Sequence, residues 1–271
     1  MKPQDSKKRI KTLLRESLPL PDDDATEQRR LNDFRKPKFG AKGMATTISS
    51  LAWHSARRAS VAANAGDFAK AEKLLAEAFR RAYWARAVLQ KEVPSTLSVI
   101  LLEAFVRESG LTTLTALMRD MSAGPDPDRL FQFPRWALRL VEWDGGPLLF
   151  DDSPYFDDGT PITDHTVPDE VVRVMCTWHL QVALREPGFS PFMFDPYIAL
   201  PVEVFAWVKR REQLGLSVPA LDHPLLTTPV AKIPLTPVDL APKGHELIEP
   251  LLDRCMKEGV LTAEQIARMS E

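Results

Sequence analysis

The feature that most restricts the fold of this chain is a stripe of apolar residues between positions 68 and 89. Its members recur at steps of three and four: Phe68, Ala71, Leu75, Ala78, Ala82, Ala85 and Leu89. This spacing places them on one face of an α-helix. A similar stripe begins at Met44 and stops at Asn64-Ala65-Gly66, where glycine suits a helix end and Asp67 can cap the next helix. We therefore expect a helical hairpin whose small alanines allow close approach.

The rest of the chain also carries helical patterns. Residues 99–106 are apolar nearly all round, which is typical of a central, buried helix. Pro134 lies inside the expected helix 128–143, where a proline should bend or interrupt it. Other helices are expected from Pro94, over 111–121, from Pro168, from Pro201, and over 244–258 and 262–270, the last with a Thr262–Gln265 capping box. No segment alternates with period two, so the chain is predicted to be all-α, a single multi-helix domain of about eight or nine helices.

Two segments interrupt the helical pattern. Residues 144–168 are predicted to be an irregular acidic loop. Residues 217–243 contain prolines at 219, 224, 229, 234, 237 and 242, a spacing that no regular helix survives. This proline-rich segment is expected to run in extended form over the helical body.

The N-terminal part differs from the rest in composition. Residues 1–43 hold twelve basic and seven acidic side chains, and the stretches 22–24 and 29–42 favour solvated chain. We predict a basic, flexible arm over 1–43 and a helical domain over 44–271.

The bulk composition points to a cytoplasmic protein. The formal net charge is −2, so no overall field favours nucleic acid as a partner. No apolar run resembles a leader or a membrane span, so no membrane partner is expected either. The two cysteines are too few for a disulfide framework and suit a reducing cytoplasm.

The acidic loop is the strongest candidate for a functional site. Residues 143–206 hold two basic and eleven acidic side chains, and neither Lys nor Arg occurs between Trp143 and Val172. Aromatic residues are interleaved with the carboxylates, which suits docking to a basic protein surface. The candidate partner-binding residues are Asp151, Asp152, Tyr155, Phe156, Asp157, Asp158 and Asp164. Divalent-metal binding and a merely solvated loop are the alternatives, although the ligand order does not fit an EF-hand.

No motif indicates catalysis. The chain lacks a phosphate-binding glycine loop, a GxSxG elbow and an HExxH helix. Cys176 and His179 lie three apart on one predicted helix, but a zinc site needs further ligands, so packing is the preferred interpretation. His54 is also expected to pack, and nothing orients His223 or His245 as an acid or base. We expect no enzyme activity, no catalytic residues, no metal site and no cofactor.

Three stretches together resemble the Immunity 49 family of bacterial polymorphic-toxin systems over roughly residues 45–255. They are SVAANAGDFAKAEKLLAEAFRRAYWARA, FDPYIALPVEVFAWVKRREQLGLSVP and DHPLLTTP. The resemblance implies a non-enzymatic immunity protein that binds a cognate toxin. We further expect that toxin to present a basic surface. It assigns no functional residue and no oligomeric state.

Two other functions remain open from the sequence. A helical-repeat-like adaptor would bind a different partner protein. The other is a metal-dependent hydrolase of the ADP-ribosylglycohydrolase type, because Asp151-Asp152-Ser153 superficially resembles the Asp-rich metal sites of that all-α family. The early Gly-Asp-rich motif and the late Asp cluster of those enzymes are missing from this chain.

Overall fold

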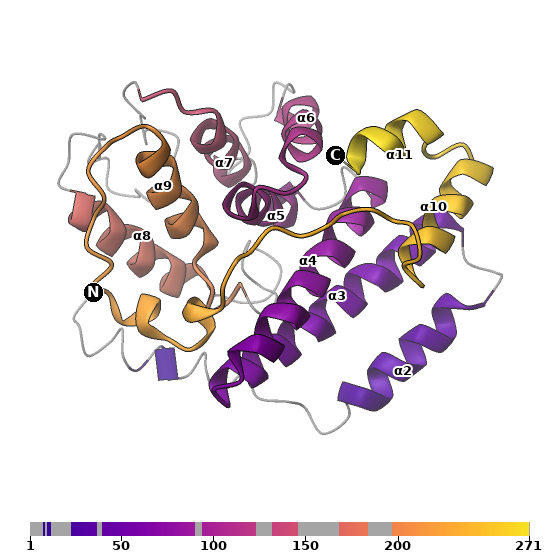
Figure 1. Cartoon of the computed structure of the whole chain (residues 1–271), viewed down its shortest axis with the longest axis horizontal. Coiled ribbons are helices and arrows are strands. Elements are labelled where there is room, and N and C mark those ends of the chain that lie inside the picture. Colours follow the sequence, from indigo (N-terminus) through magenta and orange to yellow (C-terminus); the bar gives the residue numbers. More distant parts are fainter. Residues whose placement is uncertain are drawn as a thin grey trace.

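The computed structural model describes residues 8, 10–11, 23–36, 40–89, 94–122, 132–145, 168–183 and 197–270. Over these residues the chain forms ten α-helices and two short 3-10 helices, without a strand (Figure 1). The prediction of an all-α fold is confirmed, with slightly more helices than expected.

The predicted hairpin is the longest feature of the fold. Helices α3 (Ala41–Asn64) and α4 (Phe68–Leu89) lie side by side along the molecule (Figure 1). The Asp67 carboxylate accepts a hydrogen bond from the Lys70 backbone N–H at 3.1 Å, as its predicted capping role requires. Both helices bury alanines, namely Ala45, Ala52, Ala56, Ala59, Ala62, Ala71, Ala78 and Ala85.

Helix α5 (Pro94–Arg107) occupies the centre, as its apolar sequence predicts. Three helices pack around it: α6 (Leu111–Ser122), α7 (Gln132–Glu142) and α9 (Val202–Gln213). Helix α8 (Pro168–Ala183) packs in turn against α9. Leu97, Val99, Leu101 and Leu102 have no exposed surface, so the core runs continuously through α5.

The N-terminal region contains a helix that the sequence pattern did not predict. Helix α2 (Asp23–Phe34) packs against α3, and Phe34 is buried against the core. The expectation of solvated chain over 29–42 is therefore wrong for residues 29–34, which belong to α2, and for residues 41–42, which begin α3. A division into a flexible arm 1–43 and a domain 44–271 stays a prediction.

Helix α7 corrects the expectation for Pro134. This residue is the third of α7 and lies in its first turn, where the backbone N–H has no helical partner to lose. Pro134 therefore neither bends nor interrupts the described helix. The expected start at residue 128 lies outside the described residues.

The proline-rich segment 217–243, hereafter the strap, crosses the helical body in front of α4 (Figure 1). It contains two short 3-10 helices, η3 (Pro224–Thr227) and η4 (Val230–Lys232), which the sequence pattern did not predict. Its backbone is held by side chains of the helices. The Trp84 indole donates to the Leu240 carbonyl at 3.0 Å, and the Val238 N–H donates to the Ser109 hydroxyl at 2.8 Å. The predicted extended segment is thus confirmed in outline.

Two helices follow the strap. Helix α10 (Ile248–Lys257) packs against α3 and α4, while α11 (Ala263–Met269) packs against α6. The capping box predicted for α11 is present: the Thr262 hydroxyl accepts from the Gln265 N–H, and the Gln265 side chain accepts from the Thr262 N–H. The prediction of two closing helices is confirmed.

Candidate partner-binding surface

The residues predicted to bind a partner lie outside the described residues. Asp151, Asp152, Tyr155, Phe156, Asp157, Asp158 and Asp164 all fall within 146–167. Of the acidic residues between Trp143 and Val172, the structure describes only Asp144, Asp169 and Glu170. The docking hypothesis for the seven residues therefore stays a prediction, and the described carboxylates show where the loop rejoins the helical body.

That junction is a hollow at the start of α8. Asp169 and Glu170, in the first turn of α8, line it together with Asp222 of the strap. The hollow is open to solvent and contains about 860 Å³ of space that protein atoms do not fill. One cation, Arg173, also lines it, and its guanidinium pairs with Glu170 at 2.8 Å. Three carboxylates against one guanidinium make this an acidic hollow.

One hydrogen bond fixes the strap against α8 at this hollow. The Ala220 backbone N–H donates to the Asp169 carboxylate at 2.7 Å. Because the strap has no neighbouring strand, its backbone N–H groups would otherwise bond to water, and the Asp169 carboxylate takes the place of that water at Ala220. The sequence pattern did not bring these two segments together because they lie 51 positions apart.

Two exposed apolar side chains of the strap lie close in sequence to Ala220 and Asp222, which line the acidic hollow. Val218 is 51% exposed and Leu221 is 42% exposed. Among the described residues, the other exposed large apolar side chains are Phe68, at 37%, and Met256, at 43%. Half of these exposed apolar residues therefore belong to the six residues 217–222. We call Asp169, Glu170, Val218, Leu221 and Asp222 the acidic–apolar surface.

A buried histidine and a buried glutamate form a pair between α8 and α9. His179 on α8 and Glu203 on α9 have no exposed surface, and His179 Nδ1 lies 2.7 Å from Glu203 Oε1. The other ring nitrogen, Nε2, lies 3.1 Å from the Ile198 carbonyl oxygen. Both ring nitrogens of His179 therefore face an oxygen atom of a neighbouring segment. The pair therefore joins α8 to α9 and to the turn before α9.

The groups near this pair are held in their uncharged forms. Burial, together with the nearby Glu203 carboxylate, raises the pKa of the Cys176 thiol well above its usual value. Burial also lowers the pKa of His223, and His179 lowers it further, while Asp222 opposes the shift. His223 Nδ1 accepts from the Leu225 N–H at 3.2 Å, which requires a neutral ring. A protonated thiol is a poor nucleophile, so packing describes Cys176 better than catalysis.

The remaining histidines noted in the sequence have structural neighbours. His54 is buried on α3, as expected, and its ring lies 5.5 Å from that of Trp53. His245 was expected to lack an orienting group, and this expectation is wrong. Its Nε2 lies 2.9 Å from Glu77 Oε1, and its Nδ1 accepts from backbone N–H groups at the start of α10. The contact joins the residues after the strap to α4.

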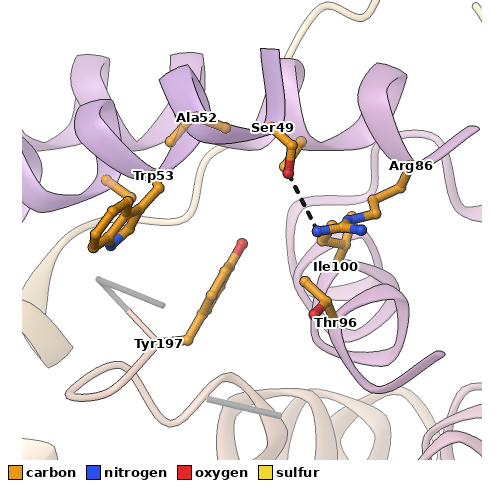
Figure 2. Close-up of a pocket in the computed structure, with 10 residues that line it drawn as sticks. Ser49, Ala52, Trp53, Arg86, Thr96, Ile100 and Tyr197 are labelled. Atoms are coloured by element: carbon orange, nitrogen blue, oxygen red, sulfur yellow. Dashed lines mark hydrogen bonds between the residues drawn. The ribbon is translucent and has the colours of Figure 1, made fainter. Parts of the chain in front are cut away.

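A second hollow lies between α3, α4 and α5. We call it the interhelical pocket and define it by Ser49, Trp53, Ala78, Arg86, Thr96 and Tyr197, which line it (Figure 2). Its space not filled by atoms is about 410 Å³, part of it open to solvent. The Arg86 guanidinium donates to the Ser49 hydroxyl at 3.2 Å across one wall (Figure 2). Sequence reasoning missed this pocket because its walls come from distant segments.

Two further observations concern metals and membranes. Across the described part of the chain, no three His, Cys, Asp or Glu side chains are arranged to hold a metal ion. Among the same residues, no helix is long and apolar enough to cross a lipid bilayer. Comparison with family models, with curated proteins and with solved structures gives no match for this chain.

Proposed function

We propose that this protein binds a partner protein with a basic surface and neutralises it by occluding it, the partner being a cognate toxin. The observation that carries the proposal is the acidic–apolar surface: Asp169, Glu170 and Asp222 line one hollow, and the exposed residues Val218 and Leu221 belong to the stretch of the strap that enters it. Exposed apolar side chains between carboxylates match the composition of protein interfaces, where apolar anchors are buried and charges stand at the rim.

The fixed backbone of this surface supports binding. The Asp169–Ala220 hydrogen bond holds the strap against α8, and the His223 side chain, which lines the hollow, caps η3 by accepting from the Leu225 N–H. A surface ordered before binding loses less conformational entropy when the partner docks. In the sequence, the segment 146–167 that precedes α8 holds five further carboxylates and neither Lys nor Arg. An excess of negative charge of this kind speeds encounter with a basic partner.

The choice of a toxin as the partner rests on the resemblance to the Immunity 49 family. That resemblance includes residues 60–87, which form the end of α3 and most of α4, and residues 222–229 of the strap. An adaptor would offer the same kind of surface to a different partner. The experiment must therefore measure neutralisation as well as binding.

The direct test is co-expression with the product of the adjacent open reading frame. We expect the two proteins to elute together in size-exclusion chromatography, and we expect the protein to relieve that product's toxicity in cells. Co-elution without relief of toxicity would contradict neutralisation and favour the adaptor. Neither co-elution nor relief would overturn the proposal.

A charge-reversal pair then tests the surface itself. Glu170→Lys with Asp222→Lys should slow association at least about tenfold at low salt and weaken its salt dependence. The matched control is Glu246→Lys with Asp253→Lys, which changes the net charge equally at exposed positions near α10, on the other side of the molecule (Figure 1). Equal effects of the two pairs would mean that the overall charge matters and the acidic–apolar surface does not.

A further inference from the structure

His223 lies where the strap enters the acidic hollow. Its side chain is 6% exposed and lines the hollow together with Asp169, Glu170 and Asp222. The same side chain caps η3, because its Nδ1 accepts a hydrogen bond from the Leu225 N–H at 3.2 Å. One imidazole ring therefore takes part both in the local fold of the strap and in the wall of the hollow.

The cap of η3 requires a neutral ring. An imidazolium has two N–H donors and no acceptor, so protonation of His223 at Nδ1 removes the partner of the Leu225 N–H. Leu225 has no exposed surface, and a buried N–H group without an acceptor is unfavourable. Protonation of His223 therefore opens the cap of η3.

The hollow offers the protonated ring a second position. Asp169 and Glu170 of α8 and Asp222 of the strap line the hollow. The described cation of the lining, Arg173, pairs with Glu170 at 2.8 Å. An imidazolium that leaves η3 gains charge-assisted hydrogen bonds when it meets the carboxylates of the same hollow. It then occupies the position that the proposed function gives to a cation of the partner.

The interior of the protein has the opposite effect on the charge of this ring. Burial and then His179 of α8 lower the pKa of His223, while Asp222 opposes the shift. His179 in turn lies 2.7 Å from the Glu203 carboxylate of α9. The interior thus favours a neutral ring and the hollow favours a charged one, so a fall in pH should move the ring from the cap toward the hollow.

We propose that His223 is a pH-dependent switch of the acidic–apolar surface. The neutral ring caps η3 and leaves the carboxylates of the hollow to a basic partner. The protonated ring leaves the cap, pairs with those carboxylates and competes with the cations of the partner. Partner binding and protonation of His223 therefore oppose each other, and binding weakens in acid. The inference rests on the proposed function, because it concerns a partner that binds at this surface.

The first measurement uses the full-length protein without a partner. Nuclear magnetic resonance follows the His223 ring and the Leu225 amide from pH 7.5 to 5. We expect both signals to change together as the ring is protonated below pH 6.5. In the His223→Asn protein, which keeps an acceptor for the Leu225 N–H and cannot titrate, the amide signal should stay constant. A ring that is still neutral at pH 5, or an amide that does not follow the ring, would overturn the proposal.

The second measurement uses the product of the adjacent open reading frame as the partner. Its affinity is measured over the same pH range at constant salt. Opposition to one proton predicts a loss of up to about tenfold in affinity per pH unit below the folded pKa of His223. His223→Asn should abolish this loss. His245→Asn should retain it, because His245 precedes α10 on the other side of the molecule (Figure 1).

The outcomes distinguish the switch from the proposed function. Absence of binding at pH 7.5 would overturn both. Binding at pH 7.5 with the same pH dependence in the wild-type and His223→Asn proteins would overturn the switch alone.

Discussion

The Glu103 carboxylate and the Arg107 guanidinium, one turn apart on α5, form an ion pair at 2.7 Å in which neither side chain has any exposed surface. The Arg107 guanidinium also donates to the Thr236 carbonyl of the strap at 2.8 Å and lies 5.4 Å from the centre of the Phe79 ring. The other Glu103 oxygen accepts from the Tyr197 hydroxyl. One pair of charges therefore joins the central helix to α4, to the strap and to the turn before α9.

This pair predicts a large loss of stability when one partner is neutralised. Glu103→Gln leaves a buried guanidinium without its counter-charge and should lower the free energy of unfolding by about 3–5 kcal/mol. Urea denaturation followed by circular dichroism measures the loss. Glu264→Gln is the control, since it removes a partner of the exposed Arg268 on α11, where the two side chains are 74% and 72% exposed. Its effect should stay below about 1 kcal/mol. Equal losses of unfolding free energy in the two variants would contradict the prediction that burial makes the Glu103–Arg107 ion pair important for stability.

Gly110 should tolerate no side chain. Its φ is +68°, and an added Cβ would lie 2.5 Å from Leu240 Cδ1 and 2.5 Å from Tyr83 Cε2. Gly110→Ala combines backbone strain with overpacking and should cost about 3 kcal/mol or more. Gly66→Ala is the matched control, because its φ is +84° but an added Cβ there meets no atom within 4 Å. Backbone strain alone predicts about 1 kcal/mol for the control. A cost for Gly110→Ala no greater than for Gly66→Ala would contradict the close approach of the strap.

The neutral state of His223 predicts a loss of stability in acid. Because burial and then His179 lower its pKa below 6.5 in the folded protein, the unfolded chain binds a proton first as the pH falls. The contribution of neutral His223 is complete above the unfolded pKa, and it is lost progressively as the pH falls below 6.5 toward the folded pKa. His223→Asn keeps an acceptor for the Leu225 N–H but cannot titrate. Chemical denaturation at intervals from pH 7.5 to 5 should show a steeper loss in the wild-type protein than in this variant. If the unfolding free energies of the wild-type and His223→Asn proteins fall in parallel with pH, the prediction is contradicted.

The strap should loosen when its hydrogen-bonding side chains are removed. Ser109→Ala leaves the buried Val238 N–H without its 2.8 Å acceptor and should cost about 1–3 kcal/mol. Limited proteolysis should then cut the strap faster than in the wild-type protein. Thr46→Ala serves as the control, since it removes an exposed hydroxyl that bonds within its own helix. Unchanged proteolysis of the strap in the Ser109→Ala protein would mean that this bond does not hold it in place.

Local sequence patterns predicted the helices whose signals lie close together along the chain. The Asp67 cap and the Thr262–Gln265 box are present, and the predicted stripe is buried at Ala71, Leu75, Ala78, Ala85 and Leu89. Its first member, Phe68, is exposed instead, and Ala82 is half-buried. Helix α2 was missed because it buries little apolar surface of its own and depends on contact with α3. The Glu103–Arg107 pair had a visible signal, namely opposite charges four apart within an otherwise apolar helix.

The candidate surface was harder to predict, because it forms from segments that meet only in the folded chain. Asp169 and Glu170 belonged to the acidic pattern, whereas Val218, Leu221 and Asp222 lay in a segment recognised only by its prolines. The interhelical pocket likewise needs three helices and Tyr197 together. Periodicity reports which face of an element is apolar, but it does not report which distant segment adjoins that face.

The way the strap is held fixes its length as well as its position. Three of its attachments, at Thr236, Val238 and Leu240, lie two residues apart, and the Asp239 carbonyl also accepts from Arg80. The side chains of Val238 and Leu240 are buried while that of Asp239 is exposed. The chain here behaves like a β-strand whose neighbouring strand is replaced by a row of helix side chains. Insertion or deletion of a single residue would invert this alternation, exposing Val238 and Leu240 and turning Asp239 inward. We therefore expect length changes within 236–240 to be poorly tolerated.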